Sequence, residues 1–167
     1  MIRVGPAGWS YEDWEGIVYP PKKGPKFDPL AYLAELFDVI ELNNTFYRPP
    51  TAQMGRSWVK RVQSNPHFRF TAKLYRNFTH ERQALTEGDE GLFKSGLAPL
   101  IEDQRLGALL LQFPYSFHHT EENLGYLKIL AEKFKEYPLV LEVRHGSWDR
   151  GPAYQFSRRS FSAQNRP

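Results

Sequence analysis

The chain contains no cysteine and no long hydrophobic run. The absence of cysteine excludes disulfide bonds, thiolate metal ligands and a cysteine nucleophile. The longest aliphatic run, residues 108–111, is far shorter than the roughly 20 apolar residues that a membrane-spanning helix needs. A strand-like pattern begins at once in residues 1–4 and leaves no room for a signal peptide. We therefore expect a cytoplasmic protein with no membrane partner.

An excess of charge of one sign is also missing from most of the chain. The 167 residues hold 22 Lys and Arg against 19 Asp and Glu, which gives a formal net charge of +3. Residues 151–167 hold three arginines and no acid, so residues 1–150 hold 19 side chains of each sign and are neutral. Bulk charge therefore gives little support to a nucleic-acid partner, which stays an alternative only through local basic groups.

Five short apolar segments recur about every 34 residues, which is the size of one strand-and-helix unit. Helix signatures lie between them. Asp28 precedes a proline at the first helical position, and Thr51 and Thr120 can cap later helices. Strands that are separated by single helices run parallel, so this order predicts an α/β fold. The segments are Ile2–Ala7, Phe37–Asn43, Phe68–Lys73, Ala108–Phe113 and Leu139–Arg144.

Two parallel architectures fit this order, a doubly wound sheet and a TIM-like (β/α) barrel. No glycine-rich phosphate-binding fingerprint follows any segment, because Gly5-Pro6-Ala7-Gly8 lacks its spacing. Polar residues at the strand ends favour the barrel, whose sites lie at the C-terminal mouth. A complete barrel needs about 250 residues. The 167 residues therefore predict an incomplete barrel of about five of the eight units.

Alternation along the segments places ionisable and amide groups on the face that would line the inside of a barrel. We interpret them as the floor of a site at the C-terminal mouth. A second interpretation stays open, a structural plug in which two glutamates pair with a lysine and an arginine. The groups are Glu41, Asn43, Lys73, Gln112, Glu142 and Arg144.

The loops that follow the segments add aromatic, basic and histidine candidates. Trp9 and Tyr11 precede Trp14 and Tyr19 in the first loop. These rings suit stacking on sugars or bases, and they equally suit a hydrophobic cluster that holds the loop down. Guanidinium groups suit a carboxylate or phosphate ligand, and histidine suits acid–base chemistry. The other candidates are Tyr47 and Arg48 after the second segment, His80 after the third, and His145 and Trp148 after the fifth.

Several motifs follow one another in a fixed order. They are Gly8–Tyr11, Glu41–Arg48, Phe70–Lys73, Leu111–Pro114 and Glu142–His145. In this order they resemble the YecE-like family, domain of unknown function seventy-two, over residues 1 to about 149. The resemblance implies a TIM-like barrel with a polar pocket at its C-terminal mouth, and it implies no particular reaction.

We expect two regions in the chain. Residues 1–149 would form the partial barrel of that family, and residues 150–167 would form a disordered tail outside the family's pattern. The tail has neither helical period nor strand alternation, which suggests a C-terminal truncation or a shifted reading frame. An incomplete barrel exposes strand edges, so we expect marginal stability unless a partner completes the sheet.

The sequence leaves three hypotheses for function. The first is a hydrolase or lyase acting on a phosphorylated or sugar-like substrate, with Glu41, Glu142, His80 and His145 as candidate acids and bases. The second is a non-catalytic receptor for a small anion or a nucleic-acid end, and the third is an inactive fragment. No cofactor is predicted, and no local cluster of histidines and carboxylates supports a metal site.

Overall fold

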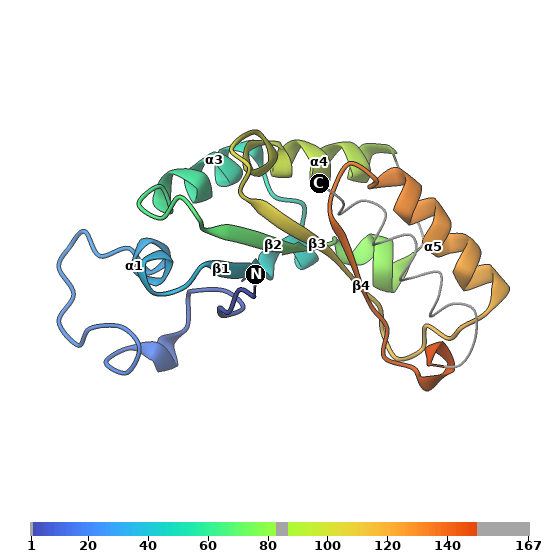
Figure 1. The fold of residues 1–167 in the computed structure, drawn as a ribbon, viewed down its shortest axis with the longest axis horizontal. Coiled ribbons are helices and arrows are strands. Elements are labelled where there is room, and N and C mark those ends of the chain that lie inside the picture. The colour runs from blue at the N-terminus through green and yellow to red at the C-terminus, as the bar shows by residue number, and fades with distance from the viewer. Residues whose placement is uncertain (1, 83–86, 150–167) are drawn as a thin grey trace.

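The computed structural model describes residues 2–82 and 87–149. In these ranges a parallel sheet of four strands, in the order β1-β2-β3-β4, is flanked by helices (Figure 1). The predicted α/β class is confirmed. The predicted tail over 150–167 lies outside the described residues. The strands are β1 (Val39–Leu42), β2 (Arg69–Lys73), β3 (Leu106–Gln112) and β4 (Leu139–Glu142).

Helical segments connect the strands, and the predicted caps are confirmed. The side chains of Asp28, Thr51 and Thr120 each accept hydrogen bonds from backbone N–H groups two or three residues further on. These bonds satisfy donors that have no partner within the helix. The longer helices are α1 (Pro29–Leu36), α3 (Ala52–Arg61), α4 (Glu87–Glu102) and α5 (Glu121–Lys133). The short ones are η1 (Glu12–Trp14), α2 (Asn44–Tyr47), the π-helix η2 (Asn77–Glu81) and η3 (Gly146–Trp148).

The predicted first strand over Ile2–Ala7 is wrong. Only Ala7 pairs with the sheet, through an isolated parallel bridge to Glu41. Pro6 has no N–H to donate, and glycines on both sides of Pro6-Ala7 weaken an extended pairing. Ile2 is also 92% exposed, so its apolar side chain gains nothing from a strand conformation. This segment therefore lies beside β1 without forming a strand.

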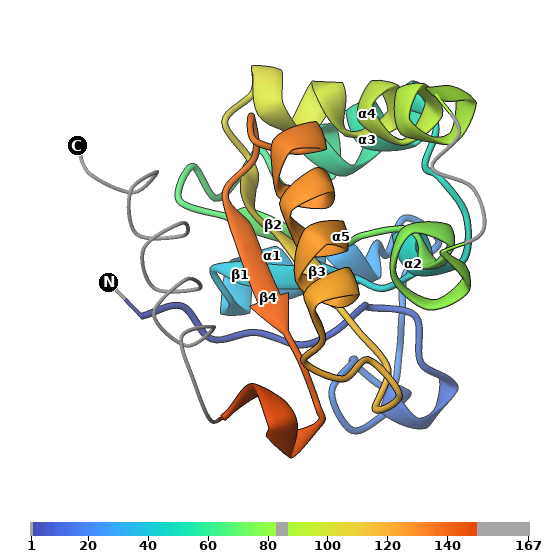
Figure 2. The same cartoon turned by 90° about the vertical axis from the view of Figure 1, so that its right-hand side faces the viewer.

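The two faces of the sheet differ in burial. Side chains that alternate along the strands, such as Ile40, Phe70 and Leu109, are buried on one face. Helices α3, α4 and α5 arch over the same side of the sheet, and Figure 2 shows α3 and α4 lying side by side. The side chains of the other face, including Glu41 and Lys73, stay half-exposed. This face is hollowed by a cavity of about 580 Å³ near Arg3, Arg69 and Gly107.

A bulge at Gly107 keeps this alternation in phase between β2 and β3. Phe70 is in register with Leu106, whereas the next residue, Thr71, is in register with Ala108. The extra residue, Gly107, faces no partner of its own. As a result Leu106 and Leu109, three residues apart, are both buried on the helix side. A bulge re-aims the side chains that follow it, and here it sets the orientation of the C-terminal half of β3.

Helices α3 and α4 approach each other closely at two glycines. A Cβ atom at Gly96 would lie 2.0 Å from the carbonyl oxygen of Pro50. A Cβ atom at Gly55 would lie 2.7 Å from the carbonyl oxygen of Gly96. Only glycine permits this approach of backbone to backbone. The contact holds the two helices over the buried side chains Trp58 and Leu97.

Asp28 ties the start of α1 to the end of α3. Its carboxylate caps α1 and also accepts hydrogen bonds from Arg61, Nε to Oδ2 at 2.7 Å and Nη2 to Oδ1 at 2.6 Å. Partial burial alone would raise the pKa of Asp28, but the hydrogen bonds from Arg61 and from the N–H groups of Ala31 and Leu30 outweigh it. The pKa of Asp28 therefore lies below its ordinary value.

Asp28→Asn is expected to destabilise the protein by about 1 kcal/mol at neutral pH, because it removes a charged hydrogen-bond acceptor while asparagine keeps the cap. The folded-state pKa is depressed. The stability that the ionised Asp28 contributes is therefore present above about pH 4, and it is lost as the pH falls through the pKa of Asp28 in the folded state. Urea unfolding of both proteins between about pH 7 and 3 tests this. A stability difference that stays constant over this range would contradict it.

Candidate functional site

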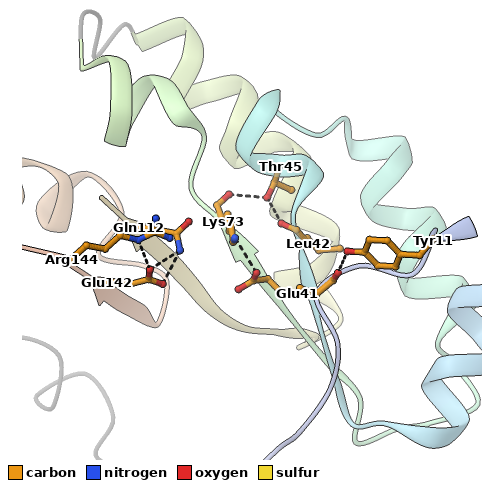
Figure 3. Close-up of polar contacts among 9 residues, drawn as sticks. Tyr11, Glu41, Leu42, Thr45, Lys73, Gln112, Glu142 and Arg144 are labelled. Carbon is orange, nitrogen blue, oxygen red and sulfur yellow. Dashed lines mark hydrogen bonds and ion pairs between the residues drawn. The ribbon is translucent and has the colours of Figure 1, made fainter. Parts of the chain in front are cut away.

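Polar side chains at the carboxyl ends of the strands form one continuous set, here called the polar row. In strand register, Lys73 lies two residues beyond the partner of Glu41, and Gln112 lies two residues beyond the partner of Lys73. Gln112 is directly in register with Glu142. Figure 3 shows Lys73 between Glu41 on one side and Gln112 with Glu142 on the other. The polar row consists of Glu41, Lys73, Gln112, Glu142 and Arg144.

Glu142 is held by two neighbours. Gln112 Nε2 lies 2.8 Å from both carboxylate oxygens, and Arg144 Nε donates to Oε1 at 3.1 Å. Partial burial alone would raise the pKa of Glu142, but these hydrogen bonds and the charges of Arg144 and Lys73 outweigh it. The pKa of Glu142 lies below its usual range. The side chain is therefore an ionised carboxylate at neutral pH and can accept a proton or a hydrogen bond.

Glu41 forms an ion pair with Lys73, with Nζ 3.3 Å from Oε1. The two side chains are 25% and 20% exposed, so solvent reaches both. The sequence predicted these groups on one face, and the plug interpretation also predicted that glutamates would pair with Lys73 and Arg144. The structure brings together five of the six predicted floor residues. It places the sixth, Asn43, at the N-cap of α2, where its side chain makes no capping hydrogen bond.

Thr45, in α2, contacts the backbone at the ends of β1 and β2, and it is not among the site residues predicted from the sequence. Its buried hydroxyl contacts the carbonyl oxygens of Leu42 at 2.8 Å and of Lys73 at 2.7 Å. A single hydroxyl proton serves one acceptor at a time, so Thr45 bridges the ends of β1 and β2 with one shared donor. Its place inside the recognisable Glu41–Arg48 motif was the only available signal.

His80 lies on η2, the next helical segment after β2. Its Nδ1 is 2.9 Å from Thr79 Oγ1, and its ring packs edge-on against Phe46 with centroids 4.9 Å apart. Partial burial lowers the pKa of His80, as do the positive charges of Arg144 and Arg76. The imidazole is therefore neutral at neutral pH. Because the charge of Arg144 acts on it, His80 belongs electrostatically with the β4 end of the polar row.

His145 belongs to a separate cluster at the ends of β3 and β4. Its Nδ1 is 2.8 Å from Ser147 Oγ and accepts a hydrogen bond from Ser147 N at 3.1 Å. Its ring stacks on His118 with centroids 3.9 Å apart. The backbone N–H of His119 donates to Ser147 Oγ at 2.8 Å. His145, predicted as an acid or base, is therefore hydrogen-bonded to Ser147 and not to a residue of the polar row.

The aromatic loop packs mainly on itself and on the core. Trp14 and Tyr19 pack with centroids 5.8 Å apart, and Trp9 meets Trp58 edge-on at 6.4 Å. This agrees with the hydrophobic-cluster interpretation for these three rings. Tyr11 differs, because it packs against Trp14 but remains 42% exposed.

The last three predicted residues lie apart from the row. Tyr47 is exposed at the end of α2 and packs edge-on against Phe46, and Arg48 is exposed just beyond it. Trp148 is buried, stacks on Phe117 and donates from Nε1 to the carbonyl oxygen of Phe117 at 2.7 Å. Its contacts are those of a core residue. Among residues 2–82 and 87–149, no three His, Asp or Glu side chains gather closely enough to hold a metal ion.

Comparison with known proteins places the chain in a family. The family model described as "Protein of unknown function DUF72" matches residues 3–165. The chain belongs to the DUF72 family. It is 32% identical over 160 residues to the UPF0759 protein YunF of Bacillus subtilis strain 168, a match that covers 93% of this chain and 55% of YunF. The DUF72 chain thus spans about half the length of this curated relative.

Two solved DUF72 structures share the fold. A DUF72 family protein from Enterococcus faecalis V583 is 28% identical, with a TM-score of 0.80, over 98% of this chain and 58% of its own. A DUF72 family protein from Thermotoga maritima MSB8 is 37% identical, with a TM-score of 0.76, over 96% of this chain and 62% of its own. The predicted family is therefore confirmed. No helix in the described part of the chain is long and apolar enough to cross a membrane.

Proposed function

We propose that the polar row binds and transforms a phosphorylated or sugar-like substrate, as a hydrolase or lyase. One observation carries this proposal: carboxylates and cations at the ends of β1, β2 and β4, with the amide of Gln112 on β3 among them, lie at the carboxyl ends of a parallel sheet, on the side opposite helices α3, α4 and α5 (Figures 1 and 2). Ligands of parallel α/β sheets bind outside these strand ends.

The environments of the two carboxylates suggest different roles. Glu142 is ionised, and Gln112 and Arg144 fix its orientation, so it can accept a proton as a general base, with a lowered pKa that makes it a weaker base than a free carboxylate. Glu41 holds the ammonium group of Lys73 by an ion pair. Lys73 and Arg144 then offer positive charge on both sides of the base, where an anionic substrate group would bind. His80 is a second candidate for proton transfer, because its imidazole is neutral and the charge of Arg144 lowers its pKa.

We further infer that the sheet is part of a TIM-like barrel. The strands follow one another in sequence order, all parallel, with the polar position moving along the strands by two residues at each step from β1 to β3. A stagger of this kind is what closing a sheet into a barrel requires. The barrel mouth would then be the place where the polar row meets its substrate.

A non-catalytic receptor for a small anion is the second candidate. It is favoured by the fact that both carboxylates already have partners, Glu41 with Lys73 and Glu142 with Gln112 and Arg144. In a receptor the same cations bind the anion and no proton is transferred. Analysis of the ligand after incubation separates the two candidates, because only an enzyme converts it.

Lys73→Met is expected to weaken the binding of ribose 5-phosphate or glucose 6-phosphate about tenfold, equivalent to roughly 1.4 kcal/mol. The substitution keeps most of the side-chain length and removes the charge that would pair with phosphate. Isothermal titration of the protein and the variant with each sugar phosphate measures the change. Lys60→Met, an exposed substitution on α3, is the matched control and should leave the affinity unchanged. Equal affinities for the protein and Lys73→Met would rule out this role of the lysine.

A further inference from the structure

A small uncharged cavity lies beside the polar row and is separate from it. Its volume is about 250 Å³, which equals roughly eight water molecules at about 30 Å³ each. It adjoins Glu41, because the N–H of Gly8 donates to the Glu41 carbonyl oxygen at 2.9 Å. None of its lining residues carries a formal charge, in contrast to the polar row. The lining residues are Gly8, Trp9, Ser10, Tyr11, Asn43 and Asn44.

Asn43, one of the residues that line this cavity, carries an unused hydrogen-bonding group. Its Oδ1 is buried and has no hydrogen-bond partner among the described residues. Asparagine at an N-cap ordinarily bonds to a backbone N–H of its helix, yet the Asn43 side chain makes no such bond. An unsatisfied buried acceptor calls for a specific explanation. The terminal torsion of asparagine is soft, so its amide can turn toward a donor in the cavity without movement of the backbone.

Tyr11 contributes a fixed aromatic ring to the same cavity. Its hydroxyl donates to the carbonyl oxygen of Ala7, and its ring packs against Trp14 with centroids 4.8 Å apart. The close approach depends on Gly8, where a Cβ atom would lie 2.9 Å from the Tyr11 hydroxyl oxygen and where φ is +86°. The ring is therefore held at both ends while 42% of the residue stays exposed.

We propose that this cavity binds one neutral sugar ring, stacked on Tyr11, with a sugar hydroxyl donating to Asn43 Oδ1. A partly exposed aromatic ring, an unsatisfied acceptor and the absence of charge together match a polyhydroxylated ring better than they match an anion. The volume has room for one ring. This inference rests on the proposed function and refines it: the polar row takes the anionic group, and the cavity selects the sugar to which that group is attached.

The test separates the two halves of the ligand. Isothermal titration and saturation-transfer NMR on the full chain use methyl α-D-glucopyranoside as the neutral probe and inorganic phosphate as the charged one. Asn43→Leu and Tyr11→Ala are each expected to weaken glycoside binding at least about tenfold and to leave phosphate binding unchanged. Lys73→Met should weaken phosphate binding and leave glycoside binding unchanged. Gln53→Leu, which removes an exposed amide on α3, is the control and should change neither.

The outcomes distinguish this inference from the proposed function. Phosphate binding that depends on Lys73, with no glycoside binding, overturns the cavity assignment alone. Glycoside binding that both cavity variants leave intact overturns it as well. Glycoside binding that depends on Asn43 and Tyr11, with no phosphate binding, supports the cavity and counts against the anionic half of the proposed function. Chemical unfolding confirms folding, and Asn43→Leu is expected to be no less stable than the parent because it removes an unsatisfied acceptor.

Discussion

Gly96→Ala is expected to destabilise the protein by about 3 kcal/mol, the upper end of the range for overpacked sites. The new Cβ atom would lie 2.0 Å from the carbonyl oxygen of Pro50 and 2.6 Å from its carbonyl carbon. These are backbone atoms, so no side-chain rotation relieves the overlap, and α4 must move away from the segment before α3. For a chain of this size the melting temperature should fall by roughly 6 to 12 °C.

Gly91→Ala in the same helix is the matched control, and it is expected to act in the opposite direction. No atom lies within 4 Å of the position that a Cβ would occupy at Gly91. Alanine is favoured over glycine inside a helix by about 0.5 to 1 kcal/mol, so this variant should be more stable than the parent. Urea unfolding of the three proteins measures both changes. If both variants changed stability in the same direction, the close packing at Gly96 would not be the cause.

Glu142→Gln is expected to lower the turnover of a sugar phosphate by about 10² to 10⁴, the range attributed to a general base. Glutamine has nearly the same shape and still accepts a hydrogen bond from Gln112 or Arg144, but it does not take up a proton. Binding of the substrate should therefore change much less than turnover. Steady-state kinetics and direct titration of the same variant separate the two quantities.

Glu121→Gln, an exposed substitution at the start of α5, controls for the loss of one negative charge and should leave turnover unchanged. Full turnover in Glu142→Gln would remove Glu142 from the role of base and leave His80 as the remaining candidate beside the row. Binding without turnover in the parent protein would favour the receptor over the enzyme. The pKa of Glu142 is lowered, so its carboxylate stays deprotonated throughout the neutral range. Titration of Glu142 should therefore not make turnover depend on pH in that range.

The sequence predicted the parts of the fold that depend on local pattern. Alternating burial along Val39–Leu42 and Arg69–Lys73, and side-chain caps at Asp28 and Thr51, are short-range features that composition and spacing reveal. The segment Ile2–Ala7 shows the limit, since its pattern is strand-like but nothing in the described chain covers its apolar side chains. A pattern predicts which face could be buried and does not supply the partner.

The sequence predicted which residues share the face of the candidate site, but it did not predict all of their hydrogen-bond and packing partners. Glu41, Lys73 and Glu142 could be placed on one face by alternation, because parallel strands bring their carboxyl ends to one edge. The partner of His145 and the buried position of Trp148 depend on how the loops after β3 and β4 meet. The unsatisfied oxygen of Asn43 was equally invisible in sequence, because an N-cap asparagine normally uses that oxygen itself.

The bulge at Gly107 determines on which face of the sheet the last residues of β3 lie. Strand side chains alternate strictly, so an offset of one residue sends a side chain to the opposite face, and an offset of two returns it. Gly107 is the one extra residue in β3, and this offset of one residue places Gln112 on the same face of the sheet as Lys73. Insertion or deletion of a single residue in β3 between Leu106 and Leu109 would therefore move Gln112 to the opposite face of the sheet, whereas a change of two residues would keep it on the same face. Evolution could retune such a site by substitution far more readily than by insertion or deletion within its strands.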